Sequence, residues 1–382
     1  MSALTMGVEE EFLLVDPASG ATVPVAEKVV ARASAADLPA GATIQRELRD
    51  TQAEAATGVC ATTAELRAHL AAGRRAVAVA ARDHGAVAVA SASPVRESGG
   101  GVPSTLARFV AIDDMYGEVT RDYEACGCHV HIGVADRDTA VAVVNHLARW
   151  LPTLLALSVN SPFYRDRDTG YGSWRIVQQS RFPGSGLAPY SRDHAAFRAE
   201  VGRLVECGAL ADEAQTFWFA RPSPKLPTVE IRVADTAATV DEAVLHATLV
   251  RALVRVALAD LDRGREAEPV PAQMAAAAVW SAARYGLTGP GVDLERSRRV
   301  PATDLVAALL DHVRDALTET GDLPEVHAQL HRLRSGGTGA ERQRRVAATS
   351  GLPAVVTELT LRDESDAPGY SEAAQASEEP HG

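Results

Sequence analysis

The sequence predicts an α+β fold in which a mainly antiparallel sheet packs against helices. Three strand-like runs, at residues 6–15, 126–134 and 228–234, are separated by long segments rich in Ala, Val and Leu. Strands and helices alternate without the regular spacing of βαβ units, which argues against a doubly wound parallel sheet. We predict a single domain over residues 1–363, followed at 364–382 by an acidic, disordered tail of Ser, Glu, Ala and Pro.

Capping-box spacing marks the starts of two long helices. In this motif a Ser or Thr precedes a Glu or Gln by three residues, and the two satisfy each other's backbone N–H groups. The spacing occurs at the start of residues 62–83 and again at the start of residues 239–260. It therefore predicts one helix over each range.

The segments between these helices are predicted from apolar runs and chain breakers. Residues 86–91 indicate a buried strand, and residues 104–122 a helix. Residues 139–159 are apolar and helical in pattern, with an interruption near Pro152. Residues 160–190 are rich in Gly, Pro, Arg and aromatics. They are too long for a simple connection, and long loops of this kind tend to be functional.

The overall charge and composition argue against several classes of function. The net charge of −12 does not favour a nucleic-acid-binding surface. No run of about 18 apolar residues predicts a membrane span, and the first residues lack the pattern of a secretory signal. The four cysteines form no CxxC motif, so reduced thiols in a cytoplasmic protein are expected. There is no Walker-type GxxxxGK[ST] loop and no GxSxG motif.

Three strand-like runs each carry two polar side chains that are two residues apart. Such side chains point to the same face of a sheet. Burying them unpaired would cost several kcal/mol each, so cations and an anionic substrate are the expected compensation. The three pairs are Glu9 with Glu11, His129 with His131, and Glu230 with Arg232.

Each pair also has a plainer interpretation. The carboxylates of Glu9 and Glu11 suit Mg²⁺ or Mn²⁺, but they could also belong to an exposed acidic strand, since Glu10 adds a third acid on the opposite side. Glu47 and Glu54, taken alone, could be solvated acids or partners in ion pairs.

The histidine pair and the Glu–Arg pair leave similar choices open. His129 and His131 could be core residues, although two on one face could instead ligate a metal or meet a phosphate. Glu230 and Arg232 could form a simple surface pair. Alternatively, the carboxylate could bind a metal while the planar guanidinium holds a phosphate or carboxylate.

Six motifs, in this order, resemble the glutamate–cysteine ligase type 2, or carboxylate–amine ligase, family of the glutamine synthetase-like superfamily. The motifs are GVEEEFLLVDP, QAEAATGVC, CGCHVHIGV, NSPFYRDRDTGYGSWR, TVEIRVAD and ARYGL, and the match runs over residues 6–348. The resemblance implies a funnel-like active site on a curved antiparallel sheet backed by helices. It also implies ATP-dependent joining of the γ-carboxylate of glutamate, or of a similar acid, to an amine such as cysteine through an acyl phosphate.

The resemblance also implies roles for individual residues, with ATP and Mg²⁺, or Mn²⁺, as cofactors. The implied metal ligands are Glu9, Glu11, Glu47, Glu54, His129 and Glu230. Arg232 would hold the transferred phosphoryl group, and His131 would face the ATP phosphates. Further candidates are Trp174 and Arg175 for the amino-acid substrate and Arg284, Arg342 and Arg344 for the nucleotide. One departure from the family is that Glu54 lies between two alanines, where branched residues are expected, which implies a looser or wider pocket.

Two other classes of function use the same residues. A metal-dependent hydrolase could be built on the carboxylate–histidine cluster, although Arg232 and the Arg-bearing loops favour phosphate handling. A non-catalytic nucleotide-binding protein is the third hypothesis. The expected partners are small-molecule substrates, with no nucleic acid and no membrane, and a homo-oligomer remains open.

Overall fold

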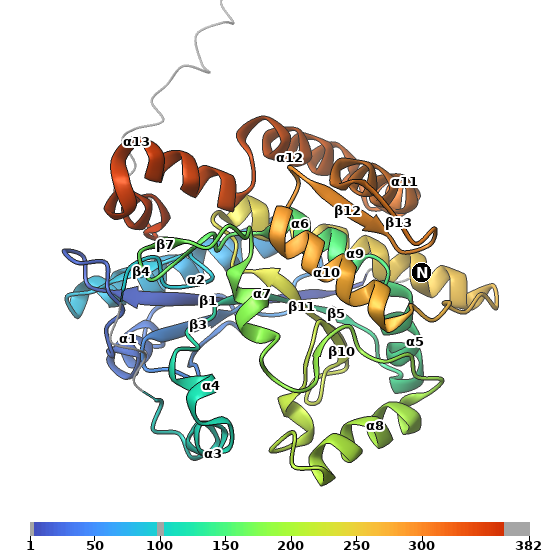
Figure 1. Ribbon diagram of the computed structural model, residues 1–382, viewed down its shortest axis with the longest axis horizontal. Coiled ribbons are helices and arrows are strands. Elements are labelled where there is room, and N and C mark those ends of the chain that lie inside the picture. Colours follow the sequence, from blue (N-terminus) through green and yellow to red (C-terminus); the bar gives the residue numbers. More distant parts are fainter. Residues whose placement is uncertain (1–3, 98–102, 363–382) are drawn as a thin grey trace, which may run out of the picture.

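The computed structural model describes residues 4–97 and 103–362 (Figure 1). The predicted tail at 364–382 lies outside the described residues. A seven-stranded antiparallel sheet runs through the centre, with the strand order β10-β11-β5-β1-β3-β2 and with β4 paired to β1. Its strands are β1 (Met6–Val15), β2 (Thr43–Arg46), β3 (Gln52–Ala56), β4 (Val87–Val89), β5 (Gly127–Gly133), β10 (Ala220–Pro222) and β11 (Thr228–Asp235). The three predicted polar strands are therefore neighbours, in the order β11-β5-β1.

One face of the sheet is covered by helices. The helices in contact with its strands include α2 (Thr63–Asp83), α5 (Arg137–Leu147), α6 (Leu151–Ser158) and α9 (Val240–Asp262). Apolar residues of the strands, among them Val8, Val130 and Ile231, are fully buried in the same core as these helices. Because side chains alternate along a strand, the polar residues between them point to the other face.

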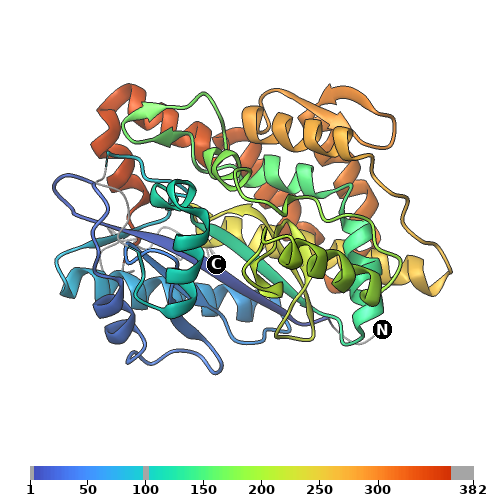
Figure 2. The same ribbon diagram turned by 60° about the horizontal axis from the view of Figure 1, so that its bottom comes forward.

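The remaining elements surround this two-layer centre. Figure 2 shows α3 and α4 (teal) and α8 (yellow-green) in front of the sheet, and α11 to α13 lie along the upper edge of the molecule in Figure 1. The helices are α1 (Ala26–Ala33), α3 (Ala107–Tyr116), α4 (Glu118–Arg121), α7 (Trp174–Gln179), α8 (His194–Glu206), η1 (Glu213–Gln215), α10 (Ala272–Tyr285), α11 (Ala302–Thr320), α12 (Leu323–Gly336) and α13 (Gly339–Leu359). Short paired strands are β6 (Phe163–Tyr164) with β7 (Arg167–Asp168), β8 (Ser185–Gly186) with β9 (Phe217–Trp218), and β12 (Pro290–Asp293) with β13 (Arg298–Pro301).

Both predicted capping positions are present. The hydroxyl of Thr62 accepts from the N–H of Glu65 at 3.1 Å, and the Glu65 carboxylate accepts from the N–H of Thr62 at 3.2 Å, so the capping box of α2 is complete. At α9 the Thr239 hydroxyl accepts from the N–H of Glu242 at 3.2 Å. The carboxylate of Glu242 is paired instead with Arg342, 2.6 Å away.

Two boundary predictions need correction, and a third is confirmed. The helix predicted over 104–122 is divided into α3 and α4 because Gly117 adopts a φ of 55°, which ends the first helix. The strand predicted over 86–91 is limited to the three residues of β4. The predicted interruption near Pro152 is confirmed, with the break just before it and the proline in the first turn of α6, where no N–H is needed.

Glu10 does not belong to an exposed acidic strand face. Its side chain lies on the helix-covered side, only 1% exposed, and accepts a hydrogen bond from Nε of Arg74 in α2 at 2.9 Å. Arg74 also donates to the carbonyl of Ala237 at 2.8 Å. This buried pair fastens β1 to α2 and leaves Glu9 and Glu11 to the opposite face.

None of the helices in the described parts of the chain is by itself long and apolar enough to cross a membrane. The bent pair formed by α5 and α6 meets the length and composition test when the two helices are taken together.

Candidate active site

Strand register places the predicted polar residues opposite one another on the face of the sheet that points away from α2, α5, α6 and α9. Across β1 and β5, Glu9 is opposite His129, and across β1 and β3, Glu11 is opposite Glu54. Across β5 and β11, His131 is opposite Glu230. Four neighbouring strands therefore contribute to one cluster, which we call the acidic cluster and which contains Glu9, Glu11, Glu47, Glu54, His129, His131, Glu230 and Arg232.

The acidic cluster contains three overlapping groups of side chains with the spacing of metal ligands. Within each group, one nitrogen or oxygen atom from every residue lies within 4.8 Å of the others. All six predicted ligands take part, and His131 takes part as well. The groups are Glu9 with Glu54 and His129, Glu9 with His131 and Glu230, and Glu11 with Glu47 and Glu54.

Glu9 stands between the two histidines. Its carboxylate oxygens lie 3.3 Å from Nδ1 of His129 and 3.3 Å from Nε2 of His131. Burial would raise the pKa of Glu9, but its contacts with both imidazoles hold that pKa well below its usual range. Glu9 is therefore ionised and negatively charged.

The two histidines differ in their electrostatic surroundings. Burial, assisted by the charge of Arg232, lowers the pKa of His129, so its imidazole is neutral and able to ligate a metal. Burial also acts to lower the pKa of His131, but the contact with Glu9 and the charge of Glu230 outweigh it and raise that pKa. His131 therefore retains a proton more readily than its neighbour.

One part of the cluster contains three neighbouring carboxylates, those of Glu11, Glu47 and Glu54. Burial raises the pKa of all three side chains. For Glu54 the pKa rises well above its usual value, because the negative charges of Glu47, Glu9 and Glu11 add to the effect of burial. Glu11 accepts the N–H of Gly127 at 2.6 Å, but no arginine pairs directly with any of the three among the described residues. A bound cation would relieve this repulsion.

Glu230 is held by two arginines, one of which the sequence did not reveal. Arg221 donates from Nε at 2.8 Å and from a terminal nitrogen at 3.2 Å, and Arg232 donates to the same carboxylate. These charges keep the pKa of Glu230 well below its usual range despite its burial. Arg221 lies directly opposite Glu230 on β10, so treating residues 220–235 as a hairpin would have found it.

The candidate substrate residues lie at the start of α7. The guanidinium of Arg175 is buried and donates to the backbone carbonyls of Arg232 at 3.1 Å and Val233 at 3.4 Å. The Arg175 side chain therefore stabilises the backbone of β11. Its contact with a substrate stays a prediction. The indole of Trp174 packs against the rings of Tyr164 and Tyr171, and its buried N–H finds no acceptor among the described residues.

The three candidate nucleotide arginines lie outside the acidic cluster, and each already has a protein partner. Arg284 lies over the rings of Tyr171 and Tyr285, at 5.4 and 5.2 Å from their centroids. Arg344 forms a two-pronged pair with Asp168, at 2.7 and 2.9 Å. Arg342 is the partner of Glu242. Their roles in nucleotide binding stay predictions.

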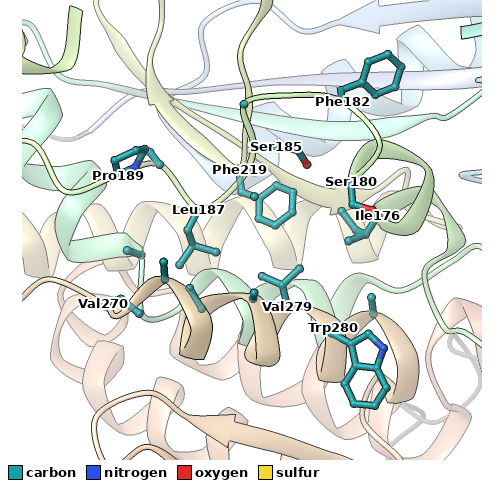
Figure 3. A pocket seen from close by; sticks show the side chains of 18 of the residues that line it. Ile176, Ser180, Phe182, Ser185, Leu187, Pro189, Phe219, Val270, Val279 and Trp280 are labelled. Carbon is teal, nitrogen blue, oxygen red and sulfur yellow. The ribbon is translucent and has the colours of Figure 1, made fainter. Parts of the chain in front are cut away.

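A separate apolar cavity of about 560 Å³ lies beside α10 and α7 (Figure 3). Its labelled lining includes Ile176, Phe219, Val279 and Trp280. None of the predicted metal, phosphate or substrate residues, all of which are described, lines this cavity. This cavity is thus distinct from the acidic cluster.

Known proteins match this sequence over nearly its whole length. The sequence model of glutamate–cysteine ligase family 2 matches residues 5–365. A relative from Saccharopolyspora erythraea, provisionally named glutamate–cysteine ligase 2-2, is 53% identical over 97% of this chain and 94% of its own length. A second, from Salinispora arenicola and provisionally named glutamate–cysteine ligase 2, is 45% identical over 91% of each chain.

Solved structures share the fold at low sequence identity. A glutamate–cysteine ligase from Francisella tularensis, solved in complex with AMP, matches with a TM-score of 0.66 and 13% identity over 94% of this chain and 87% of its own. A bifunctional glutathione synthetase from Pasteurella multocida matches with a TM-score of 0.68 and 14% identity over 93% of this chain and 52% of its own. The family model and the close relatives establish the resemblance seen in the sequence motifs: the chain belongs to glutamate–cysteine ligase family 2 and is a carboxylate–amine ligase.

Proposed function

We propose that this chain is an ATP- and Mg²⁺-dependent ligase that joins the γ-carboxylate of glutamate, or of a similar acid, to an amine such as cysteine. The observation that carries the proposal is the convergence of five carboxylates, two histidines and Arg232 on one face of the sheet. The names of the relatives support glutamate and cysteine, and the AMP in the Francisella complex supports a nucleotide site. On this proposal the sheet face forms the wall of a funnel-like site.

The acidic cluster fits divalent cations. Mg²⁺ and Mn²⁺ prefer carboxylate oxygens, and the ligand group of Glu9, Glu54 and His129 has Glu9 in common with the second group and Glu54 in common with the third. Burial is the main cause of the raised pKa values of Glu11, Glu47 and Glu54, and for Glu54 the charges of neighbouring acids add to it; a bound cation would favour the ionised form of each. When bound, the metal would neutralise negative charge on phosphate oxygens.

His131 and Arg232 suit the phosphate groups. Nε2 of His131 and Nε of Arg232 are buried, and neither makes a hydrogen bond of acceptable geometry within the described part of the chain. A buried donor without an acceptor costs about 1–3 kcal/mol, so these atoms favour a ligand that supplies oxygens. An anionic phosphate does so, and the raised pKa of His131 keeps a positive charge available for it.

The reaction would proceed in two displacements. An oxygen of the γ-carboxylate attacks the γ-phosphorus of ATP, and the P–O bond to ADP breaks with its electrons leaving on ADP. The nitrogen of the amine then attacks the acyl carbon, loses a proton, and displaces phosphate to form the amide. Arg232 would hold the phosphoryl group through both steps, because phosphoryl transfer depends mainly on positioning and neutralisation of charge.

The direct test is amine-dependent turnover. Full-length protein is mixed with ATP, Mg²⁺, glutamate and each member of an amine panel that includes cysteine. We expect ADP release that requires the amine, and a product mass equal to acid plus amine minus water. A folded sample that releases no ADP in response to any amine would count against the ligase. ADP release without an amine, together with tightly bound Zn²⁺, would support a hydrolase instead, and ATP binding without turnover would support a binding protein.

A further inference from the structure

The apolar cavity beside α10 has the size and shape of a small-molecule site. We call it the α10 cavity. Its volume of about 560 Å³ lies within the range of about 300–1,000 Å³ that is usual for ligand pockets. Ala272 and Ala283 both line it, and they lie about 16 Å apart along the helix at the usual rise per residue. The cavity is therefore elongated along α10, as Figure 3 shows.

The α10 cavity is separated from the acidic cluster by residues of α7 and by Phe219. Ile176 and Val177 of α7 line the cavity, whereas the preceding residue, Arg175, holds the backbone of β11. The side chain of Phe219 lines the cavity, while its carbonyl accepts the backbone N–H of Arg232 at 2.8 Å. A ligand in this cavity would thus occupy a compartment of its own.

The polar groups that line the cavity disfavour the binding of anionic ligands. Of the described residues that line it, only Glu268 is charged, and this exposed carboxylate forms no ion pair within the described ranges. The amide of Asn145 is already bonded to the backbone of Ser191, and the hydroxyl of Ser180 donates to Val177 at 2.7 Å. No lining residue can neutralise a phosphate or a carboxylate, so ATP and glutamate are poor ligands here.

Two aromatic rings at the cavity favour a positive charge. Trp280 and Tyr190 both line it and are 51% and 44% exposed. The indole N–H of Trp280 donates to the hydroxyl of Tyr171 at 3.2 Å, which fixes the orientation of the ring. Faces of Trp and Tyr attract cations. The aromatic rings and Glu268 thus complement the same kind of ligand.

We propose that the α10 cavity binds a small primary amine with an elongated apolar body. The hydrocarbon part lies against Ile176, Phe219 and Val279, and the ammonium group pairs with Glu268. The apolar walls supply most of the affinity, while the charge of Glu268 selects an amine over an alcohol or an acid of the same shape. The proposal concerns binding and does not depend on the ligase reaction.

Three probes of similar size test the proposal on the full chain. Binding of 4-phenylbutylamine, 4-phenylbutanol and 4-phenylbutyrate is measured by titration calorimetry and by tryptophan fluorescence, with neither ATP nor Mg²⁺ present. We expect the amine to bind about three- to tenfold more tightly than the alcohol, and the acid to bind most weakly. An acid that binds as tightly as the amine, or a failure of all three probes to bind, would overturn the proposal.

Matched variants locate the binding. Ala276→Phe fills the cavity from α10, and it should weaken amine binding roughly tenfold or more. Ala277→Phe is the control, because Ala277 is an exposed neighbour on the same helix that does not line the cavity. Glu268→Gln should weaken the amine by about two- to fivefold and leave the alcohol unchanged. Equal losses in the two phenylalanine variants, or an unchanged amine affinity in Glu268→Gln, would refute it. Failure of these titrations leaves amine-dependent ADP release untouched, so the two proposals fail separately.

Discussion

Replacing Arg221 with alanine should destabilise the protein, because Arg221 supports both the acidic cluster and the edge of the sheet. Its side chain is only 9% exposed and makes five hydrogen bonds. Two go to the carboxylate of Glu230, and three go to Ala214 and Thr216, at 2.8 to 3.1 Å. Arg221→Ala removes all of them and leaves Glu230 buried with Arg232 as its one arginine partner among the described residues.

The expected cost follows from the burial of the pair. Removing one partner of a buried ion pair typically costs about 3–5 kcal/mol. Because Arg232 continues to neutralise Glu230, we expect the lower end, about 3 kcal/mol in the free energy of unfolding. Arg198→Ala is the matched control: it breaks an Arg–Glu pair of similar length whose side chains are 59% and 55% exposed, and such pairs are worth about 0–1 kcal/mol.

Urea denaturation of both variants and of Arg221→Lys measures these costs. Lysine retains the charge but not the two-pronged contact, so it should recover part of the loss. The effect should also depend on pH. The pKa of Glu230 is lowered in the folded protein, so the contribution of the pair is fully present above the unfolded pKa of about 4.3 and is lost as the pH falls through the folded pKa. A loss in Arg221→Ala no larger than that in Arg198→Ala would refute this reasoning.

Three further predictions concern the metal, the phosphoryl group and one helix. Because burial raises the pKa of Glu54 and of its neighbours, the metal-free protein should lose stability as the pH rises above about 4.3. The increase in melting temperature caused by Mg²⁺ should therefore grow between pH 5.5 and 7.5, and it should be smaller in Glu54→Gln. An increase that becomes smaller as the pH rises would contradict this. Arg232→Ala should lower kcat by about a hundredfold or more while ATP binding changes little. Arg198→Ala, which breaks an exposed pair with Glu213 away from the acidic cluster, should stay within about fivefold, and equal losses would argue against the site assignment. Thr62→Ala should cost about 1 kcal/mol of stability in denaturant titration, and no cost would mean that the capping box of α2 is dispensable.

The polar strand pairs could be predicted because a strand repeats every two residues. Val8, Val130 and Ile231 alternate with the polar residues, and that alternation assigns the two sets to opposite faces. The inclusion of Glu47 depended on the family resemblance, since it follows β2 and no periodic pattern connects it with Glu54.

Contacts between distant parts of the chain could not be predicted in the same way. The pairing of Glu10 with Arg74 crosses from the sheet to a helix, and the two residues lie 64 positions apart. The partners of Arg342 and Arg344 likewise depend on how α13 packs against α9 and the β7 segment. A charge seen in one sequence shows that a partner is needed but not which residue supplies it.

The central position of β1 ties correct strand pairing to function. Along this strand Glu9 and Glu11 face the cluster, while Glu10 between them is bonded to α2. A shift of one residue would reverse every side chain of the strand, burying two acids among the helices and turning Glu10 outward. A molecule that pairs β1 in the wrong register would therefore lose its metal ligands and its core at the same time. The turnover recovered after refolding therefore measures the fraction of molecules in which β1 has its native register.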